Sequence, residues 1–183
     1  MESMSTEAIN AQQELEVSRA TFDCIDRAAG IFQRDFKHIP LHFDLKGRAA
    51  GQYRVRHGQA EIRYNPYLFA RYYEDNLAHT VVHEVAHYLT DQIYGQSSPG
   101  IFTRRRIKPH GEEWKSVMRR LGAEPVRTCQ YDLSGVPLRR VKYYDYACLC
   151  QAHRLSSIRH NRVMAGKASY HCKQCRGQLR PAE

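Results

Sequence analysis

Hydrophobic residues near the start of the chain recur with the period of an α-helix. Between residues 6 and 36 they are spaced by seven, three, four, three and four positions: Leu15, Phe22, Ile25, Ala29, Phe32 and Phe36. This spacing places them on one face of a long helix. Because the other positions are mostly polar, that face needs a sheet or a second helix to cover it.

Three short segments after this helix are typical of strands. Residues 41–45 alternate between apolar and polar side chains, and residues 53–56 and 61–64 flank a turn at His57-Gly58. We expect the three segments to form a small antiparallel sheet.

Three further helices are predicted. The first covers residues 66–73, because Asn65 can cap it and a proline occupies its first position. The second covers residues 76–95. The third covers residues 109–121, where a proline opens the helix and Gly122 ends it.

The second of these helices contains the segment His83-Glu84-Val85-Ala86-His87. Residues four apart lie on one helix face, so both imidazoles can reach a single metal ion at about 2.1 Å. Glu84 lies about 100° around the helix, beside the metal and not on it. The apolar residues of the helix face away from the histidines: Leu77, Val81, Val85, Tyr88 and Leu89. The pattern indicates a zinc hydrolase in which the glutamate activates water in a cleft.

A catalytic zinc needs a third protein ligand and one open position. His110, at the start of the third predicted helix, is our preferred third ligand. His79 shares the face of the helical pair, but adding it would spread the ligands over about 12 Å of helix axis, so we interpret it as a supporting or exposed residue. The carboxylates of Asp91, Glu112 and Glu113 remain alternatives.

The charge of the chain changes near residue 138. Residues 1–138 carry 18 Lys and Arg against 17 Asp and Glu, whereas residues 139–183 carry 10 against 2. We place a domain boundary there. Such an excess favours phosphate-rich partners, because lysine and arginine release condensed counterions. Interleaved tyrosines could stack on unpaired bases: Tyr143, Tyr144, Tyr146 and Tyr170. In the alternative reading, the arginines keep the tail in solution and the tyrosines pack it.

The same tail contains four of the six cysteines, and their spacing is typical of a zinc knuckle. The preferred ligand set is Cys150, His153, Cys172 and Cys175. Cys148 rivals Cys150, because a one-residue gap makes joint use of both awkward, and His171 is a weaker rival. No thioredoxin-like junction surrounds the cysteines, which disfavours a redox pair. A structural zinc is favoured because so short a tail can bury little apolar core.

Three ordered motifs resemble those of the SprT-like metalloproteases, the family that includes the eukaryotic DNA–protein crosslink protease Spartan. They are HEVAH, then PHGEEW followed by Met118, then YACLCQAHRLSSIRHNRVMAGKASYHCKQCRGQL. The resemblance covers about residues 20–180. It implies an α+β fold: a zincin-like metalloprotease domain of helices with a small antiparallel sheet over residues 1–138, followed by a small basic zinc ribbon over residues 139–183.

The resemblance also implies that His83, His87 and His110 bind the catalytic zinc and that Glu84 is the catalytic base. One feature departs from the family pattern. The 22 residues between His87 and His110 are more than we expect for bacterial members. This stretch contains a basic group made of Arg104, Arg105, Arg106 and Lys108. We expect the 96–108 loop to border the cleft.

The sequence therefore predicts a zinc metalloendopeptidase with one catalytic and one structural Zn²⁺ and no other cofactor. Its expected substrates are DNA-associated or DNA-crosslinked proteins, with DNA preferred over RNA because of the resemblance. The alternatives are a non-catalytic, zinc-stabilised nucleic-acid-binding protein, which would not require Glu84, and a zinc hydrolase of a small amide. The first twenty residues contain four glutamates and no apolar stretch, so a cytoplasmic protein without a membrane span is expected.

Overall fold

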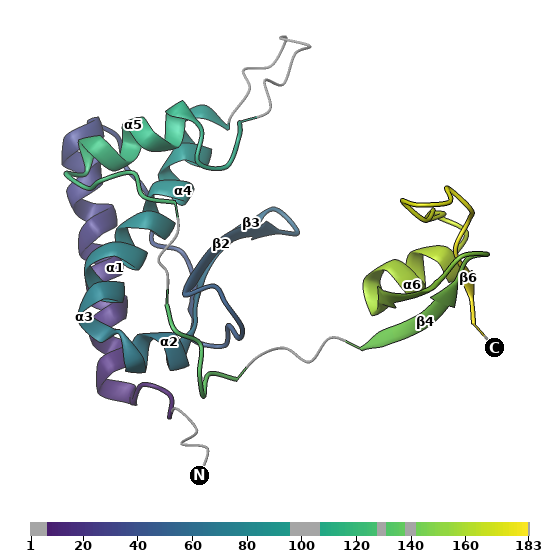
Figure 1. The fold of residues 1–183 in the computed structure, drawn as a ribbon. Coiled ribbons are helices and arrows are strands. Elements are labelled where there is room, and N and C mark those ends of the chain that lie inside the picture. The colour runs from purple at the N-terminus through teal and green to yellow at the C-terminus, as the bar shows by residue number, and fades with distance from the viewer. Residues whose placement is uncertain (1–6, 96–106, 128–130, 138–141, 183) are drawn as a thin grey trace, which may run out of the picture. The chain divides into compact units, whose positions relative to one another are not determined.

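In the computed structural model, the chain forms two compact units, Met1–Leu138 (unit 1) and Arg139–Glu183 (unit 2). Figure 1 shows the ribbon of both units. The structure describes residues 7–95, 107–127, 131–137 and 142–182. In these parts of the chain, no helix has the length and the apolar character that crossing a lipid bilayer requires.

Unit 1 begins with helix α1 (Ala11–Phe32), which is shorter at both ends than predicted. Asn10 starts the helix through a capping box: its side chain accepts the amide of Gln13 at 2.9 Å, and the Gln13 side chain accepts the amide of Asn10 at 3.0 Å. Ile25 lies on the predicted buried face, whereas Leu15 is exposed.

A three-stranded sheet follows in the order β1-β3-β2, with strands β1 (Leu41–His42), β2 (Gly51–Arg56) and β3 (Gln59–Tyr64). Strands β2 and β3 are antiparallel and joined by His57-Gly58, both of which have the positive φ that a two-residue hairpin turn requires. The prediction of a wholly antiparallel sheet was wrong for β1, which pairs with β3 in parallel. Alternation of polarity indicates which face of a strand is buried but not the direction of its neighbour.

The remaining helices of unit 1 are α2 (Pro66–Arg71), α3 (Tyr73–Asp75), the π-helix η1 (Asn76–Thr80), α4 (Val81–Tyr94) and α5 (Glu112–Arg120). The predicted helix over residues 76–95 thus begins with a wider π turn. The buried side chain of Asn76 holds this turn. It donates to the carbonyl oxygens of Leu68 at 3.0 Å and Tyr72 at 2.9 Å, and it accepts the hydroxyl of Thr80 at 2.6 Å.

Helix α5 also differs from its prediction. It begins at Glu112 and not at Pro109, with Gly111 as its extended N-cap. His110 therefore precedes the helix, in a left-handed backbone conformation with a φ of 59°. The predicted end of the helix is confirmed: Gly122 has a φ of 79°, and the amide of Ala123 bonds to the carbonyl of Met118 at 3.0 Å.

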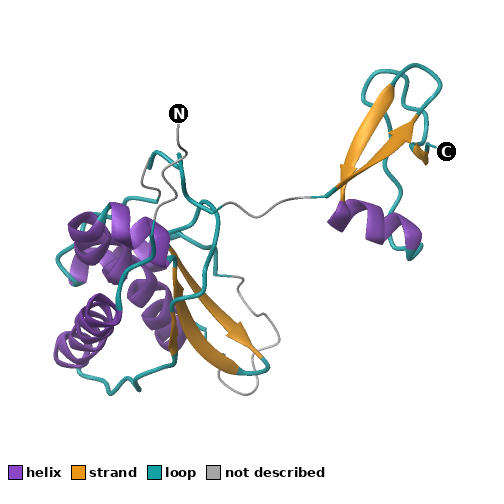
Figure 2. Cartoon of the chain, turned by 90° about the horizontal axis from the view of Figure 1, so that it is seen from below, coloured by secondary structure: helices purple, strands orange, loops and turns teal. Residues whose placement is uncertain are grey.

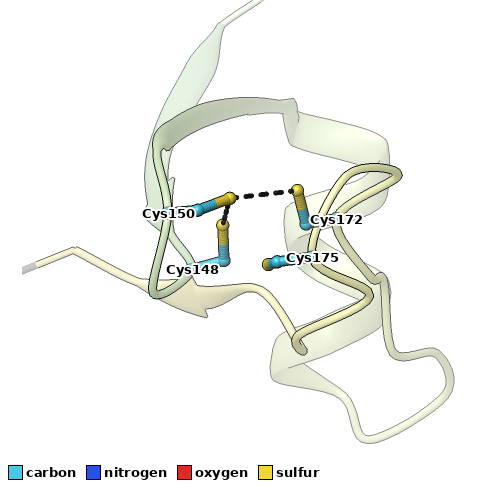
Figure 3. A group of neighbouring side chains, drawn as sticks. All are labelled: Cys148, Cys150, Cys172 and Cys175. Atoms are coloured by element: carbon cyan, nitrogen blue, oxygen red, sulfur yellow. Dashed lines mark hydrogen bonds between the residues drawn. The ribbon is translucent and has the colours of Figure 1, made fainter.

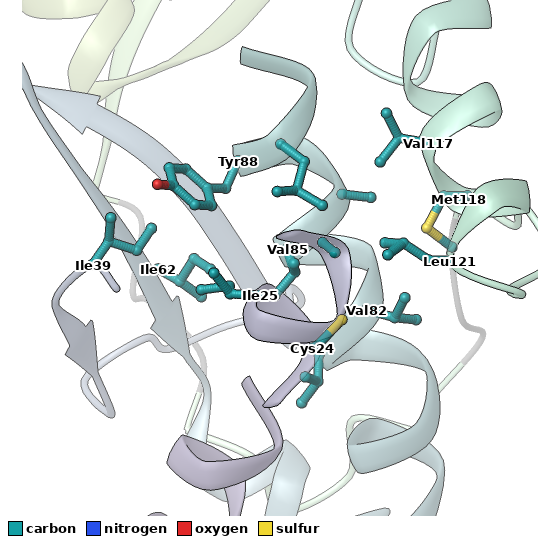
Figure 4. Close-up of a cluster of buried hydrophobic side chains, with 14 of the residues drawn as sticks. Cys24, Ile25, Ile39, Ile62, Val82, Val85, Tyr88, Val117, Met118 and Leu121 are labelled. Carbon is teal, nitrogen blue, oxygen red and sulfur yellow. The ribbon is translucent and has the colours of Figure 1, made fainter. Parts of the chain in front are cut away.

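The core of unit 1 lies between the helices and the sheet (Figure 4). Ile25 of α1, Ile62 of β3, Val85 of α4 and Val117 of α5 are fully buried in it. Figures 1 and 2 show these helices gathered beside the β2–β3 hairpin. The buried position of Val85 confirms that the histidines of α4 face away from the core.

Over residues 142–182, unit 2 contains a sheet in the order β5-β4-β6 and one helix: β4 (Tyr143–Ala147), β5 (Ala152–Ser156), α6 (Ser157–Met164) and β6 (Arg180–Pro181). Helix α6 was not predicted. It packs beside the β4–β5 hairpin (Figure 2), where the His160 ring stacks on Tyr144 with centroids 3.6 Å apart. The core cluster of this unit is small: Tyr146, Leu155, Cys172 and Leu179.

Candidate metal sites

Three histidine side chains converge in unit 1. Helix α4 presents His83 and His87 one turn apart, and the turn before α5 presents His110. The Nε2 atoms of His83 and His87 are 3.2 Å apart, and each of them is 3.0 Å from the Nε2 atom of His110. Ligand nitrogens at about 2.1 Å from a tetrahedral zinc would be about 3.4 Å apart. The three nitrogens are thus close to the spacing of a shared metal ligand set.

The chemistry of the three imidazoles supports the same interpretation. Burial, together with His110, lowers the pKa of His83 to about 4, and burial together with both other rings lowers the pKa of His87 to about 3. Burial also lowers the pKa of His110. A neutral imidazole has a single acceptor nitrogen, so three such nitrogens cannot satisfy one another. Neutral imidazole is the form that binds a metal cation.

Trp114 forms one wall of this site. Its fully buried indole lies against all three imidazoles, with centroids 4.8 Å from His83 and 4.7 Å from His110, and its Nε1 donates to the His83 carbonyl at 3.4 Å. Sequence analysis predicted the neighbouring histidine but not this contact. The sequence did contain a signal for this contact. Trp114 follows His110 by four residues, which is about one helical turn, so the two side chains lie near the start of α5.

Glu84 lies beside the histidines and not among them. Its side chain is buried, and its Oε2 accepts the backbone amide of Tyr53 at 2.6 Å. Burial raises the pKa of Glu84 to about 7, against the opposing effect of the Tyr53 amide. The carboxyl group lines the same cleft as the three imidazoles.

The cleft has a volume of about 1060 Å³ and is lined by β2, by η1 and α4, and by the segments on either side of α5. Lys108 lies on its wall, so the described end of the predicted 96–108 loop does border the cleft. The rest of that loop, residues 96–106 with Arg104, Arg105 and Arg106, lies outside the described residues. Val126 also lines the cleft, which places the segment after α5 at the site.

The rival ligands of the sequence analysis have other partners. His79 is exposed on the cleft wall and lies 3.7 Å from Asp75. Asp91 accepts the hydroxyl of Tyr53 at 2.8 Å. Glu112 pairs with Lys115, and Glu113 is not part of the histidine group. In the described residues, the group that can hold an ion here is made of His83, His87 and His110.

A second group lies in unit 2, where four cysteine sulfur atoms converge within 4.8 Å of one another (Figure 3). The sulfur of Cys150 is 3.3 Å from that of Cys148 and 3.7 Å from that of Cys172. The amide of Gln174 donates to the Cys172 sulfur, and the amide of Gly177 donates to the Cys175 sulfur, both at 3.4 Å. Such amide donors stabilise thiolates, and four thiolates fit a tetrahedral structural zinc.

This group differs from the predicted set in one member, because Cys148 takes the place of His153. The Nε2 of His153 approaches the Cys148 sulfur at 3.3 Å but is not among the four ligand atoms that all lie within 4.8 Å of one another. A tight turn explains the difference: the amide of Cys148 bonds to the carbonyl of Gln151 at 3.1 Å and brings both nearby thiols to one side. The one-residue gap is therefore no obstacle. His171 pairs with Gln178 in a β-bridge and lies outside the group.

Sequence comparison assigns the chain to a family. The profile of the SprT-like family matches residues 21–134. This chain belongs to the SprT-like family. The protein SprT of Pasteurella multocida is 37% identical over 165 residues, which cover 90% of this chain and 91% of that protein. SprT of Vibrio parahaemolyticus is 35% identical, covering 86% and 87% of the two chains, and SprT of Shewanella oneidensis is 36% identical, covering 86% and 92%. No solved structure gives a significant match.

Proposed function

We propose that this SprT-like chain is a zinc-dependent endopeptidase of the HExxH type with a zincin-like unit 1. The proposal rests on one observation: three imidazole nitrogens lie close together, and the Glu84 carboxyl group lines the same open cleft. His83, His87 and His110 would hold the ion. When bound, zinc would polarise the scissile carbonyl and acidify the attacking water.

Glu84 would supply the proton transfers of the reaction. It would take a proton from the attacking water and deliver it to the leaving amine. The Tyr53 amide at 2.6 Å restrains its carboxyl group. The cleft of about 1060 Å³ has room for several residues of a polypeptide. Trp114 closes the inner side of the histidine group and limits the motion of the imidazoles.

The arrangement favours catalysis over a purely structural role. A structural zinc is enclosed by four protein ligands, whereas a catalytic zinc keeps one position open. The histidine group has three members and faces a cleft. The cysteine group of unit 2, with four members, fits the structural description instead. We propose that it holds a second zinc.

We further propose that unit 2 binds single-stranded DNA and directs the enzyme to DNA-associated or DNA-crosslinked proteins. Helix α6 packs on the Tyr144 side of the β4–β5 hairpin, which leaves Tyr143 and Arg154 to the other side. Tyr143 is half exposed, and the guanidinium of Arg154 lies 5.1 Å from its ring centroid. An exposed ring beside a cation, on a unit with a large basic excess, suits base stacking and phosphate contacts.

A cleavage assay tests the proposal. The zinc-loaded chain and its Glu84→Gln variant would be incubated with casein, and with a protein crosslinked to a single-stranded oligonucleotide, each with and without free DNA. We expect the wild-type chain to cleave the crosslinked protein faster than the same protein without DNA. We expect the variant to retain zinc and to lose turnover.

Each outcome addresses one part of the proposal. Retained turnover in Glu84→Gln would remove the role of the glutamate. Equal rates with and without the crosslink would remove the DNA-directed substrate class. Tight DNA binding without any proteolysis would support the non-catalytic alternative.

A further inference from the structure

Strand β2 is an edge strand of its sheet, and it runs beside helix α4. Tyr53 joins the two elements at two points. Its backbone amide donates to Oε2 of Glu84 at 2.6 Å, and its hydroxyl donates to Oδ2 of Asp91 at 2.8 Å. The two acceptors are seven residues apart, which is about 10.5 Å along the helix axis. One residue of the strand therefore fixes its position along two turns of the helix.

Gly51 makes this close approach possible. A methyl group built on its Cα would lie 2.5 Å from Cγ of Glu84, 2.7 Å from its Oε1 and 2.8 Å from Cγ2 of Thr80. These separations are far below van der Waals contact. The backbone of Gly51 does not have a positive φ, so the position requires the space that glycine leaves and not its conformational freedom.

We propose that Gly51 and Tyr53 are positioning residues that hold the Glu84 carboxyl group in place for proton transfer. The inference rests on the proposed peptidase function. The Tyr53 hydroxyl fixes the strand to the helix, the Tyr53 amide then restrains one carboxylate oxygen, and the bare Cα of Gly51 leaves room for the other. A catalytic base must lie within hydrogen-bond reach of the proton it removes, and a misplacement of about 1 Å can cost about a hundredfold in rate.

The Tyr53 hydroxyl is suited to this task. Burial, followed by the hydrogen bond to Asp91, raises the pKa of Tyr53 above its ordinary value. The hydroxyl therefore stays protonated and can donate at any physiological pH. Tyr53 contacts Glu84, Asp91 and the Tyr88 ring, and Gly51 lies against Glu84 and Thr80. None of these is one of the three histidines, so substitution of Tyr53 or Gly51 should spare the metal ligands.

The test compares Tyr53→Phe and Gly51→Ala with matched controls in the full zinc-loaded chain. Tyr88→Phe keeps the ring of this α4 residue beside that of Tyr53, with centroids 6.1 Å apart, and removes only a hydroxyl that bonds to the Lys37 carbonyl at 2.9 Å. Gly30→Ala adds a methyl group where no atom lies within 4 Å. We expect kcat to fall about tenfold in Tyr53→Phe and about a hundredfold in Gly51→Ala, with KM and zinc content unchanged. We expect both controls to stay within about twofold of wild type.

Asp91 provides a rescue experiment. Asp91→Ala should reproduce the loss of Tyr53→Phe, because the hydroxyl loses its acceptor. Asp91→Asn keeps an oxygen that can accept the same hydrogen bond, and it should recover most of the lost kcat. Equal rates in the two Asp91 variants would contradict the positioning role.

A readout that needs no turnover separates this inference from the proposed function. In ¹⁵N-labelled protein, hydrogen exchange of the Tyr53 amide should be slow in the wild-type chain and in Glu84→Gln, which keeps an acceptor oxygen. It should be at least about tenfold faster in Glu84→Ala. Fast exchange in the wild-type chain would overturn the inference whatever the activity. Full kcat in both Tyr53→Phe and Gly51→Ala would overturn the positioning role and leave the proposed function intact. A wild-type chain without any proteolysis would overturn the proposed function and the positioning role together.

Discussion

The indole of Trp114 stacks on the imidazole of His87, with ring centroids 5.5 Å apart and an angle of 28° between the ring planes. Trp114 is the single tryptophan of the sequence, so tryptophan emission comes from a side chain in contact with the histidine group. We predict that adding zinc to the metal-free chain changes the tryptophan emission and that the change saturates when the histidine site is filled. A fluorescence titration measures this.

Two variants control the titration. His83→Ala should abolish the response, because it removes one of the three converging nitrogens. Cys172→Ser should leave it intact, because that residue belongs to the other unit. An unaltered response in His83→Ala would show that the emission senses zinc at another place.

We predict two zinc ions per chain. Elemental analysis of the purified protein should give two equivalents, of which His83→Ala loses one and Cys172→Ser loses the other. Brief treatment with a chelator should stop peptide cleavage, and added zinc should restore it. A single equivalent that persists in both variants would refute the two-site arrangement.

The π turn before α4 should be sensitive to the loss of a single side chain. Asn76→Ala removes the hydrogen bonds that the side chain donates to the carbonyls of Leu68 and Tyr72, and it takes away the acceptor of the Thr80 hydroxyl. We expect it to lower the free energy of unfolding of unit 1 by about 2 kcal/mol. Urea unfolding followed by Trp114 fluorescence reports on this unit specifically. Glu74→Ala, an exposed neighbour, should change the free energy by less than about 0.5 kcal/mol.

Binding of single-stranded DNA should depend on the open side of the β4–β5 hairpin. Tyr143→Ala should weaken the affinity about tenfold, the cost of losing one stacked base. Arg154→Ala should reduce the slope of log affinity against log salt by about one. Fluorescence anisotropy with a labelled oligonucleotide measures both. Tyr94→Ala, which removes a comparably exposed tyrosine from unit 1, should have no effect; equal losses in Tyr94→Ala and Tyr143→Ala would exclude a specific stacking site.

Local patterns predicted much of unit 1. The period of the apolar residues identified α1 and α4, and the His57-Gly58 pair between two strand-like segments identified the hairpin turn, where both residues have a positive φ. The spacing of His83 and His87 was sufficient to place both on one helix face, because four residues are close to one full turn. These features depend on neighbours in the sequence.

Features that depend on contacts between distant segments could not be predicted in the same way. His110 reaches the other histidines from a left-handed turn and not from a helix, which a preceding proline gave no reason to expect. Alternating polarity did not reveal that β1 is parallel to β3. The roles of Gly51 and Trp114 arise from packing against residues more than twenty positions away.

Cys150, Cys172 and Cys175, three of the four residues predicted to bind zinc in unit 2, lie in one cluster, but its fourth member is Cys148 and not His153. The spacing rule that favoured His153 considers distance along the chain, whereas the turn from Cys148 to Gln151 determines which side chains face inward. Helix α6 was missed because it has only eight residues and none of them is buried.

The small core of unit 2 also implies an uneven response to oxidative stress. Its core cluster contains Tyr146, Leu155, Cys172 and Leu179, so one of the few buried side chains is itself a member of the sulfur group. Peroxide attacks thiolates and leaves imidazoles largely unchanged. Oxidation would therefore unfold unit 2 while unit 1 persists; under the proposed function, this would leave a peptidase that is no longer guided to DNA.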